Sequence, residues 1–514
     1  MGRICIKADV RSEYMSRLAV IDIGSNSMRV IIVKILKNRS YEIMDELKGT
    51  VRLGKDMTEE GNLNSDRMEA ALKVLSYFKR LCDANEVDEI VAVATEAVRK
   101  AKNQTEFLNM AKDRVGIDIR VLTGEEEAYH DYLGVINSID VNSALLMDIG
   151  GSSTEFVFVK DRSIQKSISI PVGAISLTDK FLSLNGNKQK KLKELVRYLN
   201  DMFDSIGWLK DVRGIPLIGI GGSFRTLGKI HRNKYSYPLN NNHNYCISSK
   251  SVFELYDCLK YVDISQYKKI KGISKDRADI FYGALVSIVS VIKYCKLRDV
   301  AISGNGLRQG IVYRVLLEDY PPVIQNILDF SLNNIVNNFD LNKGHVRQVW
   351  RLCKKLSQDI SDMVSLSVQD YKILKTAAYL HDCGISIGFD SHEKYSFSII
   401  KDLKIYGITH REQIMAAFVV SHLEEYKIKD SQYFNSIIKE EDIVLVNQMS
   451  VILHIAKGLD RAMDGNIMDI KTDIGKDSVL IELISKKEPS LEISTASNCK
   501  YDFENIFGKK LVIK

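Results

Sequence analysis

The chain has 514 residues, of which 45% are hydrophobic and 27% are charged, and these are the proportions of a globular protein. Its formal net charge of +6 is too small an excess to indicate nucleic-acid binding. No apolar run approaches the roughly 20 residues that a membrane span needs, and the eight cysteines form no C-x-x-C pair. With no secretory leader at its start, we expect a cytoplasmic protein with reduced thiols, no membrane partner and no specific nucleic-acid partner.

The chain up to a Pro-Pro pair at 321–322 predicts an α/β architecture. Strand-like runs such as AVIDI, EIVAVAT and SALLMDIG alternate there with helical patterns, for example at 66–82 and 278–294. The prolines mark a break, after which residues 324–461 show mostly the 3.6-residue period of helices. Short strand-like pieces return from residue 468.

One internal repeat divides the α/β part. Residues 18–33 and 144–159 align from Asp22 and Asp148 onward, and both read as apolar strand, Asp, Ile, Gly, small polar turn, apolar strand. The repeat predicts two similar lobes, each with a strand–turn–strand hairpin, and a cleft between them. In chain order we expect an N-terminal extension at 1–16, lobes at 17–135 and 136–318, a helical domain at 324–465 and a small β-rich tail at 466–514.

The polar turns of the repeat predict phosphate binding. A Gly/Ser turn between two strands exposes backbone N–H groups that form an anion site, and hydroxyls and amides add donors. Two further Gly-rich turns lie at 219–228 and 303–310. Each turn alone could need glycine only for a positive φ, but the four together favour phosphate, and none fits a P-loop or dinucleotide fingerprint. The candidates are Asp22, Gly24, Ser25, Asn26, Ser27, Gly150, Gly151, Ser152, Ser153, Thr154, Gly221, Gly222 and Ser223.

An aspartate precedes each of the two repeated turns. A carboxylate beside a phosphate is repelled unless a cation lies between them, and Mg²⁺ binds through one or two carboxylates together with phosphate oxygens. Asp22 and Asp148 therefore predict a magnesium–phosphate chelate. The alternative is that each carboxylate only caps its own turn.

Six ordered motifs resemble one known family. AVIDIGSNS, ATEAVRKAKN, TGEEEA, LLMDIGGSST, GIGGSFRTLGKI and SGNGLRQGIVY have the order and spacing of the exopolyphosphatase / guanosine pentaphosphate phosphohydrolase (Ppx/GppA) family. The resemblance is close over about 17–316 and looser beyond. It implies two ribonuclease-H-like lobes of the actin/Hsp70/sugar-kinase superfamily, followed by an all-α HD-like domain and a small α+β tail. One departure is Ser152, where the family usually has a third glycine.

The resemblance also implies roles for single residues. Glu127 would be the general base, Asp148 and Glu155 would hold Mg²⁺ through phosphate, and Arg99 would clamp a substrate phosphate. From the residues alone, the run GEEEA could equally be a solvated helix N-terminus. A sugar kinase of the same superfamily is a further alternative, but no sugar-binding insert with a catalytic Asp is evident. The family expectation is a homodimer.

Histidines are concentrated in the C-terminal part. The order His345, then adjacent His381 and Asp382, then Asp460 resembles the HD superfamily of metal-dependent phosphohydrolases, and His392 and His422 lie where two-metal members place extra ligands. Imidazole and carboxylate together suit Fe, Mn or Zn. In the Ppx/GppA family this region is HD-like but often degenerate. The sequence therefore leaves open a separate metal phosphohydrolase, a regulatory binding module or a structural domain.

Together these patterns predict an Mg²⁺-dependent exopolyphosphatase that releases orthophosphate from the end of polyphosphate. A guanosine pentaphosphate phosphohydrolase is the close alternative, since both substrates present the same terminal phosphoanhydride.

Overall fold

The computed structural model describes residues 14–58, 60–182, 188–421 and 433–514, and these divide into two compact units. One unit contains the chain up to Ser236 and residues 242–325, and the other contains residues 237–241 and the chain from Asn326 onward. Among the described residues, no helix is long and apolar enough to cross a membrane.

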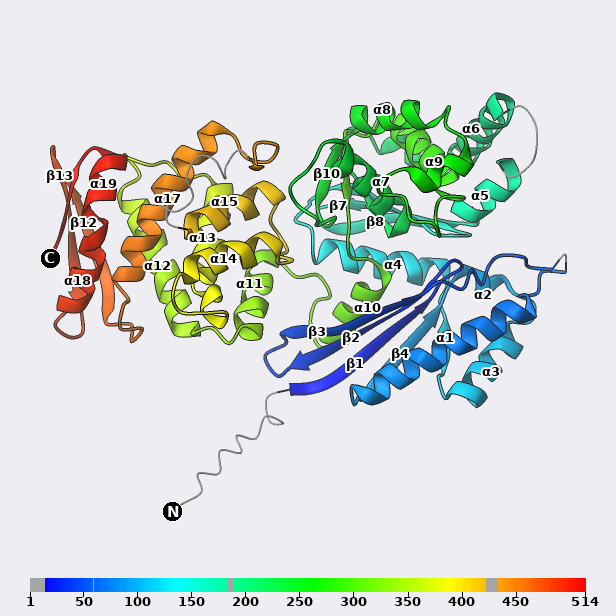
Figure 1. Cartoon of the computed structure of the whole chain (residues 1–514), viewed down its shortest axis with the longest axis horizontal. Helices are drawn as coiled ribbons and strands as arrows, with labels where there is room; N and C mark the ends of the chain where they lie inside the picture. Colours follow the sequence, from blue (N-terminus) through cyan, green and yellow to red (C-terminus); the bar gives the residue numbers. More distant parts are fainter. Residues whose placement is uncertain (1–13, 59, 183–187, 422–432) are drawn as a thin grey trace, which may run out of the picture. The chain divides into compact units, whose positions relative to one another are not determined.

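The first lobe is built on a mixed five-stranded sheet with the order β3-β2-β1-β4-β5. Strands β1 to β3 are an antiparallel meander, whereas β4 and β5 run parallel to β1. Alternate residues of β1 (Ala19, Ile21 and Ile23) pack with residues of α1 and α3, which cover one face in Figure 1. The elements are β1 (Tyr14–Ile23), β2 (Met28–Leu36), β3 (Tyr41–Gly49), α1 (Ser65–Ala84), β4 (Glu89–Ala94), α2 (Glu96–Lys100), α3 (Gln104–Val115), β5 (Ile119–Val121) and α4 (Gly124–Ile136).

The second lobe repeats this pattern in a six-stranded sheet of order β10-β11-β9-β6-β7-β8. Strands β6 to β8 are an antiparallel meander, β9 and β11 run parallel to β6, and β10 is added antiparallel at the edge. The elements are β6 (Ala144–Ile149), β7 (Thr154–Lys160), β8 (Ser163–Ile170), α5 (Ala174–Phe181), α6 (Lys188–Ser205), β9 (Leu217–Ile220), α7 (Gly221–Lys234), β10 (Tyr245–Ser248), α8 (Ser249–Leu259), α9 (Phe281–Tyr294), β11 (Asp299–Ile302) and α10 (Leu307–Leu316).

The two sheets share one topology: a three-stranded meander whose first strand is followed by parallel strands reached through helices. This is the ribonuclease-H-like arrangement, so the predicted fold class of the two lobes is confirmed. In each lobe, the turn between the first two strands of the meander lies at one edge of the sheet. The helix that follows the next parallel strand begins at this same edge.

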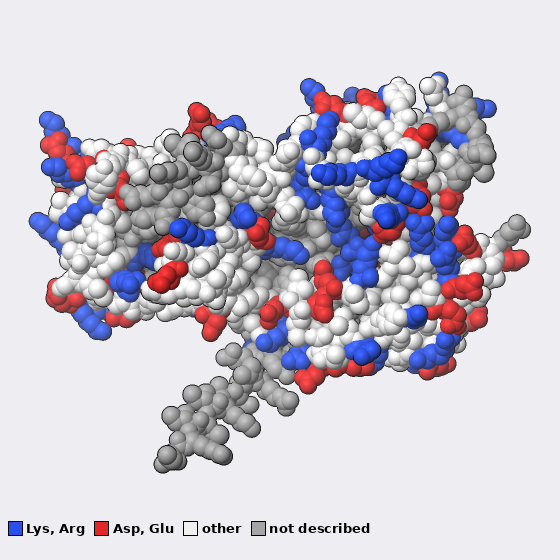
Figure 2. All heavy atoms as spheres, in the orientation of Figure 1, with Lys and Arg blue, Asp and Glu red and all other residues white. Residues whose placement is uncertain are grey.

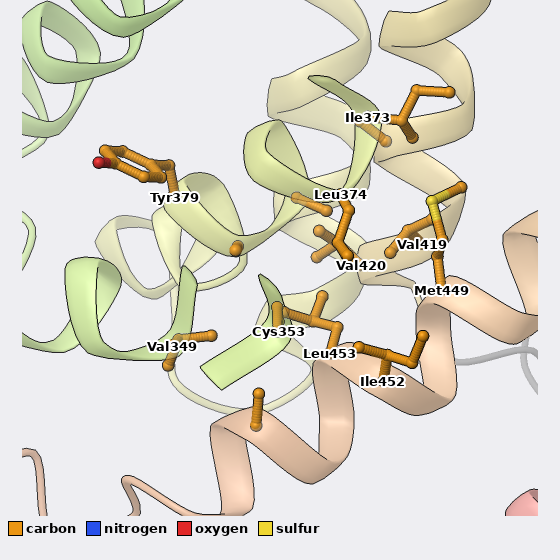
Figure 3. Packing of buried hydrophobic residues seen from close by; sticks show 14 of the residues in the cluster. Val349, Cys353, Ile373, Leu374, Tyr379, Val419, Val420, Met449, Ile452 and Leu453 are labelled. Atoms are coloured by element: carbon orange, nitrogen blue, oxygen red, sulfur yellow. The ribbon is translucent and has the colours of Figure 1, made fainter. Parts of the chain in front are cut away.

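The second unit is a helical domain with a small sheet. Its core is formed by buried residues of α12, α13, α15 and α17, and Figure 3 shows Leu374, Val420 and Leu453 among the side chains that meet there. The helices are α11 (Ile327–Asn338), α12 (Lys343–Asp359), α13 (Val368–Leu380), α14 (His392–Asp402), α15 (His410–Val420) and α17 (Glu440–Gly458).

A three-stranded sheet of order β12-β13-β14 completes this unit. Ile470 and Ile481, from β12 and β13, belong to the same buried cluster as the helices, so the sheet shares their core. The expected helical domain followed by a small α+β tail is confirmed. The elements are β12 (Ile467–Ile474), β13 (Ser478–Ser485), α18 (Ser490–Ala496), α19 (Lys500–Phe507) and β14 (Lys510–Ile513).

Candidate active site

Two hairpin turns, at 24–27 and 150–153, face a common pocket. Asp22 lies near the end of β1, opposite Arg29 on β2, while Asp148 lies near the end of β6, opposite Glu155 on β7. The turns themselves are adjacent, because a Cβ added to Gly151 would lie 3.0 Å from the Cβ of Ser25. Both turns line the pocket.

Hydrogen bonds to its carbonyl groups hold each turn in place. The carbonyls of Ser25 and Asn26 accept hydrogen bonds from the amides of Gly54 and Arg52, at 2.9 Å each. In the second lobe the carbonyls of Gly150 and Gly151 accept from the first amides of α5, at 2.9 and 2.8 Å. The N–H of the next residue points away from such a carbonyl across a trans peptide. The N–H groups that follow these carbonyls in the chain therefore point away from these hydrogen bonds, as a phosphate-binding turn requires.

The third and fourth Gly-rich segments bring helix N-termini to the pocket. Helix α7 begins at Gly221 and α10 follows Gly306, and both glycines line the pocket. Gly221 has φ of +85°, and a Cβ there would collide with Oδ1 of Asp148. The unpaired N–H groups and the dipole of such a helix end favour an anion. These two segments therefore complement the hairpin turns.

Four arginines line the same pocket: Arg29, Arg225, Arg277 and Arg308. Burial and the neighbouring guanidinium groups together lower the pKa of Arg225 to about 9, although Asp148 opposes them. Burial and nearby arginines also lower the pKa of Arg29, and burial lowers that of Arg277. Figure 2 shows Lys and Arg side chains gathered along the junction of the two lobes. Like charges held this close indicate an anion-binding site.

Carboxylates lie beside these arginines. Burial raises the pKa of Asp148 to about 6, with Asp22 adding to the rise, and raises that of Glu155 to about 8, with Asp148 adding to the rise. Burial also raises the pKa of Asp22, against the opposing effect of Arg308 and Arg29. Because the carboxylates repel one another, a cation between them would relieve the repulsion.

The three glutamates of the acidic run GEEEA, at the start of α4, lie in three different environments. Glu126 forms a capping box with Thr123, its carboxylate accepting from the Thr123 amide at 2.9 Å, and Glu125 is exposed. Glu127 is only 9% exposed and lines the pocket. Burial, then the charges of Glu155, Asp148 and Asp22, raise its pKa well above the usual value, against the effect of Arg99. Glu127 is thus the one acid of this run that lines the pocket.

Arg99, a residue of α2, lies behind Glu127. Its Nη1 is 3.2 Å from Glu127 Oε2 and donates to the Leu122 carbonyl at 2.6 Å, while its Nε donates to Glu96 Oε2 at 3.0 Å. The guanidinium is therefore engaged by protein groups, and Arg99 is not among the residues that line the pocket. These contacts indicate that Arg99 orients Glu127.

The structure separates the predicted phosphate-binding residues into two groups. Most line the pocket, but Ser152, Thr154 and Ser223 are not among its lining residues. Thr154 donates its hydroxyl to the Val172 carbonyl at 2.6 Å. Glu155 also lies behind the wall, where it accepts from Ser169 at 2.7 Å. The predicted residues that line the pocket are Asp22, Gly24, Ser25, Asn26, Ser27, Glu127, Asp148, Gly150, Gly151, Ser153, Gly221 and Gly222.

Sequence reasoning missed the four arginines. A signal was present for three of them, because Arg29, Arg225 and Arg308 each lie four or five residues after a glycine of a Gly-rich turn. Arg277 belongs to no such motif and is brought to the pocket only by the tertiary fold. Among the described residues, neither atom of the buried Asn26 amide has a hydrogen-bond partner. An amide in this state suits a ligand in the pocket.

The donor set fits magnesium. Asp22 and Asp148 both line the pocket and approach it from opposite lobes. Oxygen ligands from one or two carboxylates, with the rest from water and phosphate, are what Mg²⁺ prefers. Glu155 is too deeply buried to be a direct ligand in this arrangement, being only 2% exposed.

The helical unit brings together three of the predicted metal ligands. His345 Nε2 lies 3.2 Å from His381 Nε2, and Asp382 Oδ2 lies 3.3 Å from His381 Nε2 and 3.6 Å from His345 Nε2. Asp460 lies behind His345, with Oδ2 2.7 Å from His345 Nδ1. His422 lies outside the described residues.

Hydrogen bonding fixes the state of the two imidazoles. His345 Nδ1 faces the Asp460 carboxylate, and His381 Nδ1 faces the Ala378 carbonyl at 2.9 Å, so both Nδ1 atoms carry the proton. In the neutral rings both Nε2 atoms are then acceptors, directed at each other and at the Asp382 carboxylate. Burial lowers the pKa of His381, which favours the neutral form. Three converging acceptors need a cation, and this set fits a transition-metal ion.

The fold and the pocket define a class: two-lobed, ribonuclease-H-like proteins with paired hairpin turns and several arginines around one pocket. The sequence matches the Ppx/GppA phosphatase family over residues 16–319 and domain III of that phosphatase family over residues 327–495. The chain belongs to the Ppx/GppA phosphatase family and is a hydrolase, as the six motifs predicted.

Individual relatives agree with this assignment. The guanosine-5'-triphosphate,3'-diphosphate pyrophosphatase of Vibrio vulnificus is 25% identical over 79% of this chain and 80% of its own length. The Ppx/GppA family member of Aquifex aeolicus is 30% identical, with a TM-score of 0.52 over 60% of this chain and 99% of its own. An exopolyphosphatase from Cytophaga hutchinsonii is 26% identical, with a TM-score of 0.56 over 60% of this chain and 100% of its own.

Proposed function

We propose that this phosphatase is an exopolyphosphatase that hydrolyses the terminal phosphoanhydride bond of inorganic polyphosphate. The observation that carries the proposal is the cluster of four arginines around the pocket: among the described residues, only Arg308 of the four forms an ion pair, with Glu46 at 3.2 Å. A polyphosphate chain carries about one negative charge for each phosphate unit and supplies these guanidinium groups with several oxygen acceptors.

Glu127 is the proposed general base. Its carboxylate takes a proton from the attacking water, the water oxygen bonds to the terminal phosphorus, and the bridging P–O bond breaks. The electron pair of that bond stays on the shortened chain, and orthophosphate is released. Mg²⁺ held by Asp22, Asp148 and phosphate oxygens would neutralise charge on the terminal phosphates. Arg99 holds the Glu127 carboxylate in place.

Guanosine pentaphosphate is the second candidate substrate, and the Vibrio vulnificus relative favours it. A guanine base would be held best by stacking on an aromatic ring or by a fixed set of polar groups. Among the described residues that line the pocket there are no aromatic side chains; arginine, glycine and small polar residues predominate. This lining favours a substrate made only of phosphates.

Orthophosphate release from long-chain polyphosphate and from guanosine pentaphosphate, measured with Mg²⁺ at equal concentrations of terminal phosphate, tests the proposal. We expect polyphosphate to be the better substrate. Glu127→Gln should lower that rate ~10²–10⁴-fold, which is the usual worth of a general base. Glu125→Gln, in the exposed neighbour on the same helix, should leave the rate unchanged. Release from the nucleotide alone would select the second candidate, and a wild-type rate in Glu127→Gln would disprove the base assignment.

We propose in addition that the helical unit holds a transition-metal ion on His345, His381 and Asp382. Support comes from the three converging acceptor atoms and from Asp460, which orients His345 as a second-layer carboxylate often does in metal sites. Metal analysis of the purified full chain should find an ion that the double variant His381→Ala/Asp382→Ala lacks. Wild-type protein free of transition metal after loading would disprove this centre.

A further inference from the structure

Lys457, at the end of α17, lies on the other side of Asp382 from the two histidines. Its Nζ is 2.9 Å from His392 Nε2, 3.1 Å from Asp382 Oδ1 and 3.6 Å from Glu393 Oε1. The side chain is 18% exposed. One imidazole and two carboxylates therefore surround an ammonium group, and such a donor set could itself bind a divalent ion.

His392 has the state of a metal ligand. Its Nδ1 lies 3.0 Å from the Phe389 carbonyl, which places the proton on Nδ1 and leaves Nε2 as an acceptor. An ammonium group has donors only, so the contact with Lys457 uses the lone pair that a metal would use. His392 is thus oriented in the same way as His345 and His381, but it faces a cation that the chain itself supplies.

Asp382 joins the two positions. Its Oδ2 faces the two Nε2 atoms of His345 and His381, and its Oδ1 faces Lys457. A carboxylate that offers one oxygen to each of two cations is the usual bridge of a two-metal site. Here one of the two cations is a lysine.

We infer that the Lys457 ammonium occupies the second cation position, so that this centre holds one transition-metal ion and not two. The inference rests on the proposed metal centre at His345, His381 and Asp382. The charge on Lys457 balances Asp382 and Glu393 without an ion, and a cation near the last turn of α17 also suits the helix dipole. A second divalent ion would be repelled by the ammonium and would find the His392 lone pair in use.

Metal stoichiometry of the full chain tests this inference without reference to activity. Metal-free protein is dialysed against Mn²⁺ or Co²⁺, and the bound metal is measured per chain, with the visible spectrum of the Co²⁺ form as a second readout. Wild type should bind one ion. Lys457→Met, which keeps an unbranched side chain about one atom shorter and removes the charge, should bind two. Lys457→Arg should stay at one, and so should Lys476→Met, an exposed lysine in the β12–β13 turn.

A second substitution identifies the new ligand. Adding His392→Ala to Lys457→Met should return the count to one, because the second ion then loses its imidazole. Two ions in wild type, or one or none in folded Lys457→Met, would overturn the inference, and Lys457→Gln repeats the test if Lys457→Met does not fold. No ion in wild type would instead disprove the metal centre itself, so the two failures can be told apart.

Discussion

Glu127 lines the pocket and is paired with Arg99, which lies behind it. Their contact holds a buried carboxylate whose pKa is raised chiefly by burial and lowered by Arg99. A general base must be ionised, so the rate should fall as pH drops through the raised pKa. The acid limb of the pH–rate profile is therefore a direct readout of this pair.

We expect Arg99→Met to lower kcat about 10–10³-fold and to leave KM for polyphosphate nearly unchanged, because the guanidinium acts on Glu127 and not on substrate. Loss of its charge should raise the pKa of Glu127 further, which moves the acid limb of kcat/KM to higher pH by about one unit. Rates between pH 5 and 9 measure both effects. Arg114→Met, in an exposed ion pair with Glu69, is the matched control. A raised KM with an unmoved limb would instead support the phosphate clamp that the family resemblance implies.

Glu155 predicts a pH dependence of stability. Burial raises its pKa from 4.5 to about 8, so between these values the folded state binds a proton that the unfolded state has lost. Stability therefore falls as pH rises from about 5 to 8. In Mg²⁺-free buffer, Glu155→Gln should flatten this fall and be more stable than wild type at pH 8, by about 1–3 kcal/mol. Thermal unfolding at several pH values measures this difference in stability. An equal fall of stability with pH in the two proteins would contradict the prediction.

At the residue scale, the sequence identified the acids better than the cations. Glu127 and the two aspartates belong to motifs, and their polarity within apolar runs makes them visible. An arginine in a sequence is usually a solvated surface charge. Only the fold reveals that Arg277, distant in sequence from every motif, converges with three others.

The junction of β9 and α7 is the element that sets the position of Asp148. Gly221 opens the helix with φ of +85°, a conformation that favours glycine, and its missing Cβ leaves room for the Asp148 carboxylate. Gly214, shortly before β9, also has positive φ, at +69°, but a Cβ there would meet no atom within 4 Å. Substitutions at these two glycines therefore separate the effect of backbone strain from the effect of losing the space beside Asp148.

Gly221→Ala should lower activity at least about 10²-fold, because the added methyl group displaces a carboxylate that the proposed reaction needs, and a small misplacement has such effects. Gly214→Ala carries a similar backbone penalty, about 1 kcal/mol, and should retain the wild-type rate. Orthophosphate release and thermal unfolding of both variants test the difference. Equal loss of activity in the two would show that the backbone conformation, and not the space beside Asp148, matters.

At the element scale, the two hairpins could be predicted because an Asp-Ile-Gly triplet interrupts two apolar runs in the same way. The pairing of Asp22 with Arg29 and of Asp148 with Glu155 could not, since the register depends on the length of each turn. That register explains why Glu155 faces the interior beside Asp148 and accepts from Ser169.

At the scale of the whole molecule, the chain passes between the two units three times. Residues 237–241 leave the first unit, belong to the helical unit and then return, before the final crossing after Gln325. Tyr237 Oη lies 2.9 Å from His410 Nδ1, and Leu239 belongs to the buried cluster of the helical unit. No pattern in the sequence marks this segment, because five residues are too few for a period and their partners lie far along the chain.

The segment predicts that the helical unit depends on a residue of the α/β part of the sequence. Leu239 is 3% exposed, so Leu239→Ala should destabilise the helical unit by about 2–4 kcal/mol through lost burial and the cavity left behind. Thermal unfolding of the full chain should show an earlier transition for that unit, while the α/β unit and its phosphatase activity remain. Asn240→Ala, in the exposed neighbour, should change neither. An unchanged unfolding transition in Leu239→Ala would mean that residues 237–241 pack on the helical unit without stabilising it.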